Sequence, residues 1–149
     1  MLNPSTADAE RDDATIRRCI ALSRGHGFDA LVVVNLFALR ATDPKRLRAA
    51  ADPVGAQNDR VITRALARAT TVIAAWGTHG TLAARDAVVA ARLHATGRDV
   101  RCLGRTQDGH PRHPLYVRRD AALVPFAEEP SAPHARARSA PKIIRPMTA

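Results

Sequence analysis

The string GHPRHP at residues 109–114 carries two histidines within four positions and is the most unusual string in the chain. Proline fixes its own φ and restricts the residue before it, so both imidazoles stand on extended, rigid backbone. A neutral imidazole near pH 7 donates, accepts or transfers a proton, and a guanidinium suits a phosphate. We therefore predict catalytic roles for His110 and His113 and ligand binding by Arg112. Structural loop histidines are the alternative.

The turn NPSTAD at residues 3–8 offers a second group of polar side chains. The carboxamide of Asn3 could orient a water molecule or the polar edge of a ligand, so we predict a catalytic role for Asn3 and ligand binding by Ser5. Asn and Ser also suit a tight turn, because their side chains bond to local backbone. Both interpretations of Asn3 stay open, whereas Asp8 is explained as an acid at the start of a helix.

Four candidate ligand-binding residues follow the apolar runs ALVVV and TVIAA; they are Asn35, Phe37, Trp76 and His79. Asn is a poor strand residue, so Asn35 either bonds to a ligand or caps the loop that follows it. Phe37 could stack on a planar ligand, although core packing explains it, and Trp76 also, more simply. The turn WGTHG would offer helix-start N–H groups to an anion, but it is neither a Walker motif nor GxGxxG. His79 either begins a helix or contacts a ligand.

Hydrophobic periodicity and turn residues place these groups on alternating helices and strands. The expected elements are a helix from Asp12 or Asp13 that stops at 25–27, a strand at 30–35, helices at 44–51 and 57–69, a strand at 71–76, a helix from Thr78 or Thr81 to Gly97, and a strand at 100–103. Residues 115–117 and 122–126 are edge strands or irregular. Such alternation favours parallel pairing with right-handed crossovers. We predict an α/β fold, a three-layer sandwich with a small, mainly parallel sheet.

One α/β domain is expected over residues 1–127, followed by a disordered basic tail rich in Pro, Ala and Arg at residues 128–149. The pair Met1-Leu2 resembles the end of a strand, because the NPSTAD turn and a helix follow it at once. A sheet of only three strands would be small. We therefore expect the sheet to lack its first strand or strands at the N-terminus.

Ligands of open parallel sheets bind beyond the carboxyl ends of the strands. The loops at 3–8, 35–43, 76–80 and 104–114 follow such ends and are rich in polar residues that helix periodicity does not explain. Polar loops that converge on a rigid scaffold are a common location for a site. We predict that these four loops meet at a shared rim.

The amino-acid composition favours some classes of function and excludes others. The 149 residues are 46% hydrophobic, enough for a core, and carry a formal net charge of +9. That charge indicates a nucleic-acid or nucleotide partner, unless it reflects only an Arg-rich surface from a GC-rich coding sequence.

Cys19 and Cys102 lie in apolar runs and are expected to be free thiols of a cytoplasmic protein. No apolar stretch suits a membrane span, and the first residues lack the charged-then-apolar layout of a signal peptide. No residue cluster has metal-ligand spacing, so we expect no membrane, metal or cofactor.

The strings MLNPSTAD, DDATIRRC, LVVVNLFALRATDP, AAWGTHG and CLGRTQDGHPRHPLYV together resemble the bacterial family of domain of unknown function 1643 over about residues 1–117. The resemblance to that family implies no particular activity. Its members usually carry a further strand-rich segment before the NPSTAD motif, which agrees with the expected lack of a first strand.

The layout is also similar to the uracil-DNA glycosylase superfamily. This resemblance implies that Asn3 positions a hydrolytic water, that Asn35 or Phe37 contacts a base, and that His113 or His110 stabilises the departing base anion. The chain departs from that pattern at HPL, where a His-Pro-Ser loop is usual, and we identify no residue that could act as a wedge for base flipping. The sequence thus favours a hydrolase of N-glycosidase type that recognises a nucleobase or nucleotide. The alternative is a non-catalytic module that binds a nucleotide or nucleic acid; the oligomeric state stays open.

Overall fold

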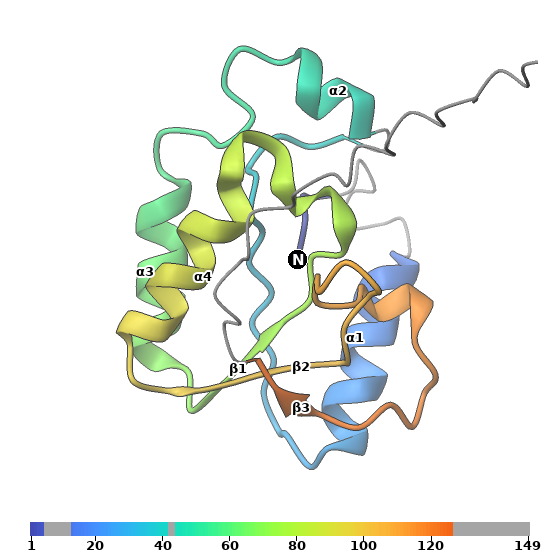
Figure 1. Ribbon diagram of the computed structural model, residues 1–149. Coiled ribbons are helices and arrows are strands. Elements are labelled where there is room, and N and C mark those ends of the chain that lie inside the picture. Colours follow the sequence, from blue (N-terminus) through green and yellow to red (C-terminus); the bar gives the residue numbers. More distant parts are fainter. Residues whose placement is uncertain (5–12, 42–43, 127–149) are drawn as a thin grey trace, which may run out of the picture.

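The computed structural model describes residues 1–4, 13–41 and 44–126 (Figure 1). The elements in chain order are α1 (Ala14–Gly25), α2 (Pro44–Ala49), α3 (Asn58–Arg68), β1 (Thr71–Ala74), the 3-10 helix η1 (Thr78–Ala84), α4 (Arg85–Ala95), β2 (Asp99–Cys102), the 3-10 helix η2 (Pro114–Tyr116) and β3 (Val124–Pro125). The predicted tail at 128–149 and the predicted ligand-binding residue Ser5 lie outside the described residues.

The predicted first helix is confirmed, and its capping follows local chemistry. The Asp13 carboxylate accepts hydrogen bonds from the N–H groups of Thr15 and Ile16, which have no partner inside the helix. The helix ends at Gly25, and the His26 N–H bonds back to the last turn. A free N–H at a helix start is costly unless it is capped, so Asp13 determines where α1 begins.

The predicted single helix from Thr78 or Thr81 to Gly97 is wrong. Residues in this range form η1 and then α4, with a break at Ala83 and Ala84, whose φ values are 53° and 52°. Left-handed backbone cannot continue an α-helix, and non-glycine residues adopt it only under tertiary constraint. Neither alanine carries a local signal for such a break.

The sheet is small and mixed. Strand β1 pairs with β2 in parallel, with Thr71 opposite Asp99, and β2 pairs with the short β3 in antiparallel orientation. The predicted strands at 71–76 and 100–103 thus correspond to β1 and β2, whereas residues 115–117 fall largely in a 3-10 helix. The α/β class is confirmed, and the described sheet contains one parallel and one antiparallel pair.

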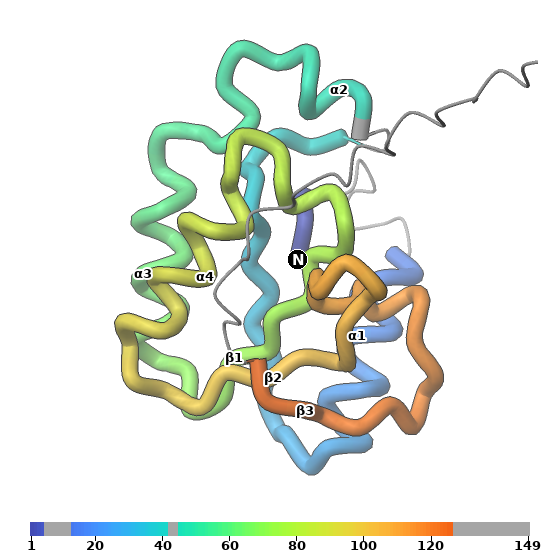
Figure 2. The backbone as a smooth tube through the Cα atoms, viewed as in Figure 1, coloured from blue at the N-terminus to red at the C-terminus, as the bar shows by residue number. Residues whose placement is uncertain are grey.

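The strand predicted at 30–35 is not formed. The segment is extended and runs upward beside β1 in Figure 2, but no strand is assigned there in the part of the chain that the structure describes. Its ladder-like bonds occur only at the carboxyl end, where the Met1 amine donates to the Val34 carbonyl at 2.9 Å and the Leu36 N–H donates to the Met1 carbonyl at 2.9 Å. A strand needs a neighbour along its length, and this segment has one only at its last residues.

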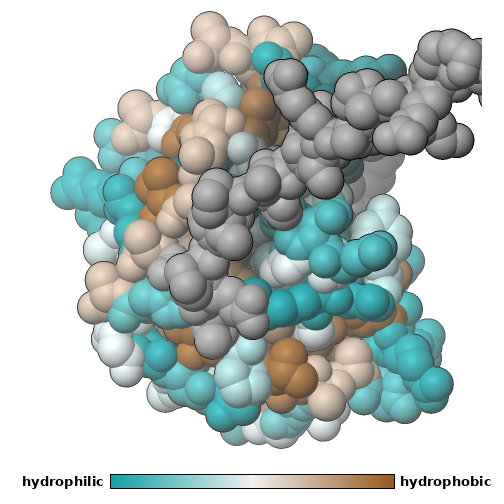
Figure 3. All heavy atoms as spheres, in the orientation of Figure 1, coloured by the Kyte–Doolittle hydropathy of each residue, from teal (hydrophilic) through white to brown (hydrophobic). Residues whose placement is uncertain are grey.

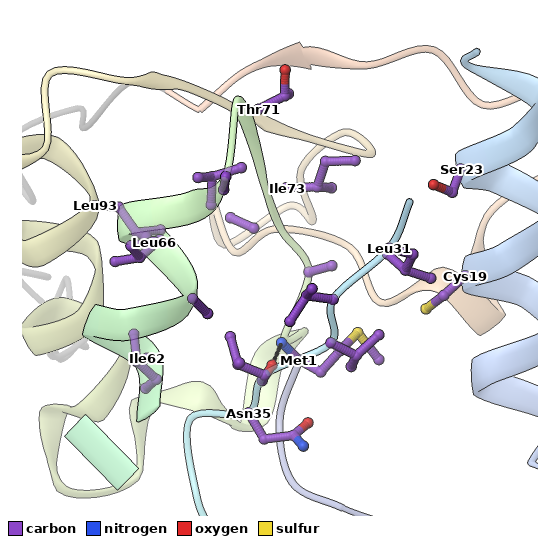
Figure 4. Close-up of a pocket in the computed structure, with 18 of the residues that line it drawn as sticks. Met1, Cys19, Ser23, Leu31, Asn35, Ile62, Leu66, Thr71, Ile73 and Leu93 are labelled. Carbon is purple, nitrogen blue, oxygen red and sulfur yellow. Dashed lines mark hydrogen bonds between the residues drawn. The ribbon is translucent and has the colours of Figure 1, made fainter. Parts of the chain in front are cut away.

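The core lies around β1 and β2. Helices α3 and α4 lie on one side of β1 and α1 lies on the other (Figures 1 and 4). Buried residues from these elements and from the loops form one cluster: Leu36, Phe37, Ala41, Leu47, Ile62, Leu66, Ala74, Trp76, Val89, Ala90, Leu93, Val100, Cys102 and Phe126. Aliphatic residues thus enclose the three aromatic residues of this cluster, Phe37, Trp76 and Phe126.

The surface is polar without being uniform. On the face in Figure 3, hydrophilic side chains are spread over several regions and are interrupted by apolar ones. Among the described residues, no helix has both the length and the apolar character needed to cross a membrane.

Candidate functional site

The described parts of the four predicted loops lie next to one another at one end of β1. The Gly77 N–H donates to the Pro111 carbonyl at 2.9 Å, which joins the WGTHG turn to the histidine loop. Gly80 lies against Leu36, since a Cβ added to Gly80 would be 3.0 Å from the Leu36 Cδ1 atom. Residues 1–4 bond to residues 34–41. We call this junction of residues 1–4, 34–41, 76–80 and 110–114 the rim.

His113 uses one ring nitrogen for the backbone. Its Nδ1 accepts a hydrogen bond from the Leu115 N–H at 3.3 Å, at the start of η2. Burial, and to a smaller extent the nearby amino group of Met1 in its protonated form, lower the pKa of His113, while Asp13 acts in the opposite direction. A neutral imidazole whose Nδ1 is an acceptor carries its proton on Nε2. His113 is therefore a neutral donor near pH 7.

His110 faces the start of α4. Its Nδ1 lies 3.7 Å from the Asp86 Oδ2 atom, and its backbone N–H donates to the Thr106 hydroxyl at 3.1 Å. Asp86 is in the first turn of α4, where a carboxylate is favoured by the helix dipole. The imidazole of His110 and the carboxylate of Asp86 are thus within ion-pair distance of each other. The sequence did not indicate Asp86, because an acid at a helix start has a sufficient local explanation.

The carboxamide of Asn3 is held by the backbone. Its Nδ2 group donates to the Pro4 carbonyl at 3.0 Å and to the Ala41 carbonyl at 2.6 Å. Both N–H donors of the amide are thus in use, and the orientation of the side chain is fixed by a segment 38 residues away. What Asn3 can offer to a ligand or a water is its Oδ1 atom, an acceptor.

The peptide after Asn35 is fixed by two buried side chains. Asn58 Nδ2 donates to the Asn35 carbonyl at 3.1 Å and to the Leu36 carbonyl at 2.8 Å, and Arg85 Nε donates to the same Leu36 carbonyl at 2.9 Å. Buried polar groups need such partners. Asn58 and Arg85 therefore position Asn35, whose half-buried side chain lines the cavity described below.

Arg85 is only 4% exposed, and its charge is balanced by Asp59. Asp59 also accepts from Arg92 Nη2 at 2.6 Å, so one carboxylate joins α3 to two arginines of α4. The hydrogen bond from Arg85 is the main reason that the pKa of Asp59 lies below its usual range. Sequence reasoning missed these residues, because a buried arginine has the same local signature as the many exposed ones.

The other candidates occupy different environments. Phe37 is fully enclosed in the core, and Trp76 is buried with its ring edge-on to Phe126 at a centroid distance of 5.5 Å. Both side chains therefore pack in the core, and that of Trp76 also lines the cavity described below. His79 is exposed on η1, and exposed Arg112 donates from Nε to the Arg105 carbonyl at 2.9 Å.

A cavity of about 920 Å³ adjoins the rim (Figure 4). It lies between α1, α3, β1 and residues 28–36, and Met1, Asn35, Trp76 and Pro114 connect its lining to the rim. Aliphatic side chains make up most of the lining, so the cavity suits apolar material. Within the ranges that the structure describes, no three His, Cys, Asp or Glu side chains converge as metal ligands.

Comparison with known proteins identifies the family of the chain but no activity. No curated protein and no solved structure matches the chain, so the resemblance to uracil-DNA glycosylases stays a prediction. The model of one family, described as a protein of unknown function (DUF1643), matches residues 1–115, in agreement with the family resemblance of the sequence motifs. The chain therefore belongs to the DUF1643 family.

Proposed function

We propose that the rim binds a nucleobase or nucleotide and hydrolyses its N-glycosidic bond. The observation that carries this proposal is the state of His113, a neutral imidazole whose Nε2–H is a hydrogen-bond donor. When the bond between the sugar C1′ atom and the base nitrogen breaks, the bonding electrons leave with the base. A fixed donor stabilises that developing anion.

Asn3 would act on the water. The Oδ1 atom is the acceptor that its backbone-bonded amide can offer, and an acceptor next to the sugar orients a water molecule by taking one of its hydrogens. The water oxygen then bonds to C1′, and its proton is transferred to the base anion. Sugar hydroxyl and free base are the products, and the balance requires no other reactant.

In this proposal, the side chain of Asn35 recognises the base. No hydrogen bond of its carboxamide is found among the described residues, and this side chain lines the cavity beside the rim. A carboxamide carries both a donor and an acceptor, which match the polar edge of a base. Phe37, the other candidate for this contact, is enclosed in the core. The net charge of +9 favours approach of a phosphate-bearing substrate.

The test is release of free base from DNA that carries uracil, hypoxanthine or xanthine, measured by liquid chromatography. His113→Asn is the decisive variant, because the Asn oxygen can still accept from Leu115 while the donor at the Nε2 position is lost. We expect its turnover to fall by roughly 10²–10³-fold. Asn3→Ala should reduce turnover as well, and Arg118→Ala, which removes only an exposed ion pair with Asp120, should leave it unchanged.

Two results would contradict the mechanism. Equal base release by the wild type and His113→Asn would remove His113 from the chemistry. Saturable binding that weakens steeply with salt, with no release of base by any form, would instead favour the non-catalytic module, because phosphate contacts displace counterions. Circular dichroism of each variant ensures that only folded protein is compared.

A further inference from the structure

The apolar cavity runs along two backbone edges. Its lining includes every residue of 30–36 and every residue of 71–76, a run that contains β1. Successive side chains of extended backbone point to opposite faces, so a cavity against one face would contact alternate residues only. Contact with every residue places the cavity beside the edges, where backbone N–H and C=O groups point. Figure 4 shows the cavity-lining side chains gathered between these segments.

Among the residues that the structure describes, neither edge has a strand neighbour on the cavity side. Strand β1 is at the end of the order β1-β2-β3, so its pairing is confined to β2. In the described part of the chain, the N–H groups of residues 30–35 have no backbone partner. The apolar side chains here are also uncovered, since Leu31 is 42% and Val32 is 74% exposed. Unpaired edges of this kind are templates for another strand.

We call the space between residues 30–35 and β1 the gap. Helices line the cavity on both sides of it. Cys19 and Ser23 of α1 lie on one side, and Ile62 and Leu66 of α3 with Leu93 of α4 lie on the other (Figure 4). A strand between two helical layers is apolar on both faces, because a buried charge without a partner is costly. The occupant of the gap must therefore be a continuous run of apolar residues.

Met1 gives the direction of that strand. Its amine donates to the Val34 carbonyl and its own carbonyl accepts from the Leu36 N–H, so both bonds flank residue 35, which is the parallel pattern. Residues 30–36 and β1 also run in the same direction in Figures 1 and 2. A strand that ends beside Met1 would be parallel to both neighbours.

We propose that the gap between residues 30–35 and β1 is a strand slot that binds an apolar peptide in extended conformation. A peptide of roughly five residues spans its length at about 3.3 Å per residue. Backbone hydrogen bonds would supply affinity and the two helical faces would select apolar side chains, as in other cases of β-strand addition. The sheet would then be mainly parallel, with helices on both faces. This inference is independent of base hydrolysis at the rim.

The experiment adds the synthetic peptide EEGVIVVL, with a free carboxyl terminus, to the full chain. Its glutamates suit Arg68, which lines the cavity just before β1, and its carboxylate would lie beside the Met1 amine. Two signals report occupancy: the fluorescence of Trp76, the single tryptophan, and the rate at which a thiol reagent labels Cys19 in the lining. We expect a saturable fluorescence change, slower labelling of Cys19 and slower amide exchange at residues 31–34. Cys102, buried outside the lining, is an internal control for unfolding.

The control peptide has the same side chains but is N-methylated at alternate backbone nitrogens. It keeps the apolar surface and loses the donors, so it should bind roughly tenfold more weakly or worse, as the loss of two or more hydrogen bonds requires. Equal binding of the two peptides would show that the cavity takes apolar material without strand pairing and would overturn the proposal. Failure of EEGVIVVL to bind, or binding of decanoate that EEGVIVVL cannot displace, would overturn it too.

Discussion

The amine of Met1 donates a hydrogen bond to the carbonyl of Val34 at 2.9 Å, which joins the first residue to a segment 33 positions away. Burial lowers the pKa of this amine from 8.0 to about 6. The folded protein therefore holds the amine in its neutral form at pH 7, whereas the unfolded chain is still largely protonated there.

The first prediction concerns pH and stability. Because the unfolded chain binds the extra proton between pH 6 and pH 8, the free energy of unfolding should rise across this interval by up to roughly 2–3 kcal/mol. Below pH 6 the contribution is absent, and above pH 8 it is complete. Urea unfolding at pH 5.5, 7.0 and 8.5 measures it. The N-acetylated chain has no titrating amine, so an identical pH dependence in that form would contradict the prediction.

Replacement of Asp59 should destabilise the protein through Arg85. Asp59→Asn leaves the buried guanidinium of Arg85 without its counter-charge, at a cost of about 1–3 kcal/mol, which is less than for a fully buried pair because the Asp59 side chain is 39% exposed. The difference between wild type and variant should shrink in acid, as the pH falls through the lowered pKa of Asp59. Thermal and urea unfolding test both statements.

Asp120→Asn is the matched control for that substitution. It removes a carboxylate from the exposed pair with Arg118, whose ionic contact is surrounded by solvent. We expect its melting temperature to equal that of the wild type. If Asp120→Asn lowered the melting temperature more than Asp59→Asn, the burial of Arg85 would not explain the stabilising effect of its ion pair with Asp59.

Gly80→Ala should disturb the contact between the WGTHG turn and the core. A Cβ at this position would lie 2.5 Å from the Trp76 Cδ1 atom and 3.0 Å from the Leu36 Cδ1 atom, so the indole must move. Overpacking of this kind costs about 1–3 kcal/mol. Gly25→Ala, at the end of α1 with open space around it, should be neutral or stabilising by about 0.4–1 kcal/mol. Urea unfolding, with Trp76 fluorescence as the signal, compares them.

The ring of His113 should titrate below the usual imidazole value. Its pKa is lowered mainly by burial, so the neutral form persists to pH values below 6.5. A reaction that needs the neutral donor would keep its rate down to that range and lose it only at lower pH. NMR titration of the ring signals measures the midpoint directly, and a midpoint above 6.5 would contradict the assigned environment.

Local signals in the sequence were sufficient where a residue acts on its immediate neighbours. A cap of α1 by Asp12 or Asp13 and the apolar runs of β1 and β2 were predicted, because capping and β propensity depend on a few adjacent residues. The structure selects Asp13 as the cap. The absence of a disulfide between Cys19 and Cys102 was predicted as well. The adjacency of the described parts of the four loops followed from one general rule, that ligand sites lie at the carboxyl ends of parallel strands.

Only the tertiary structure decided the rest. Residues 30–35 have strand propensity but no strand, because pairing needs an edge that another segment must supply. The break at Ala83 and Ala84 and the burial of Arg85 against Asp59 arise from contacts across elements, and no local pattern encodes them. Sequence alone determined which residues favour helix or extended backbone, whereas three-dimensional packing decided which edges stay open, since pairing and burial depend on residues far away along the chain.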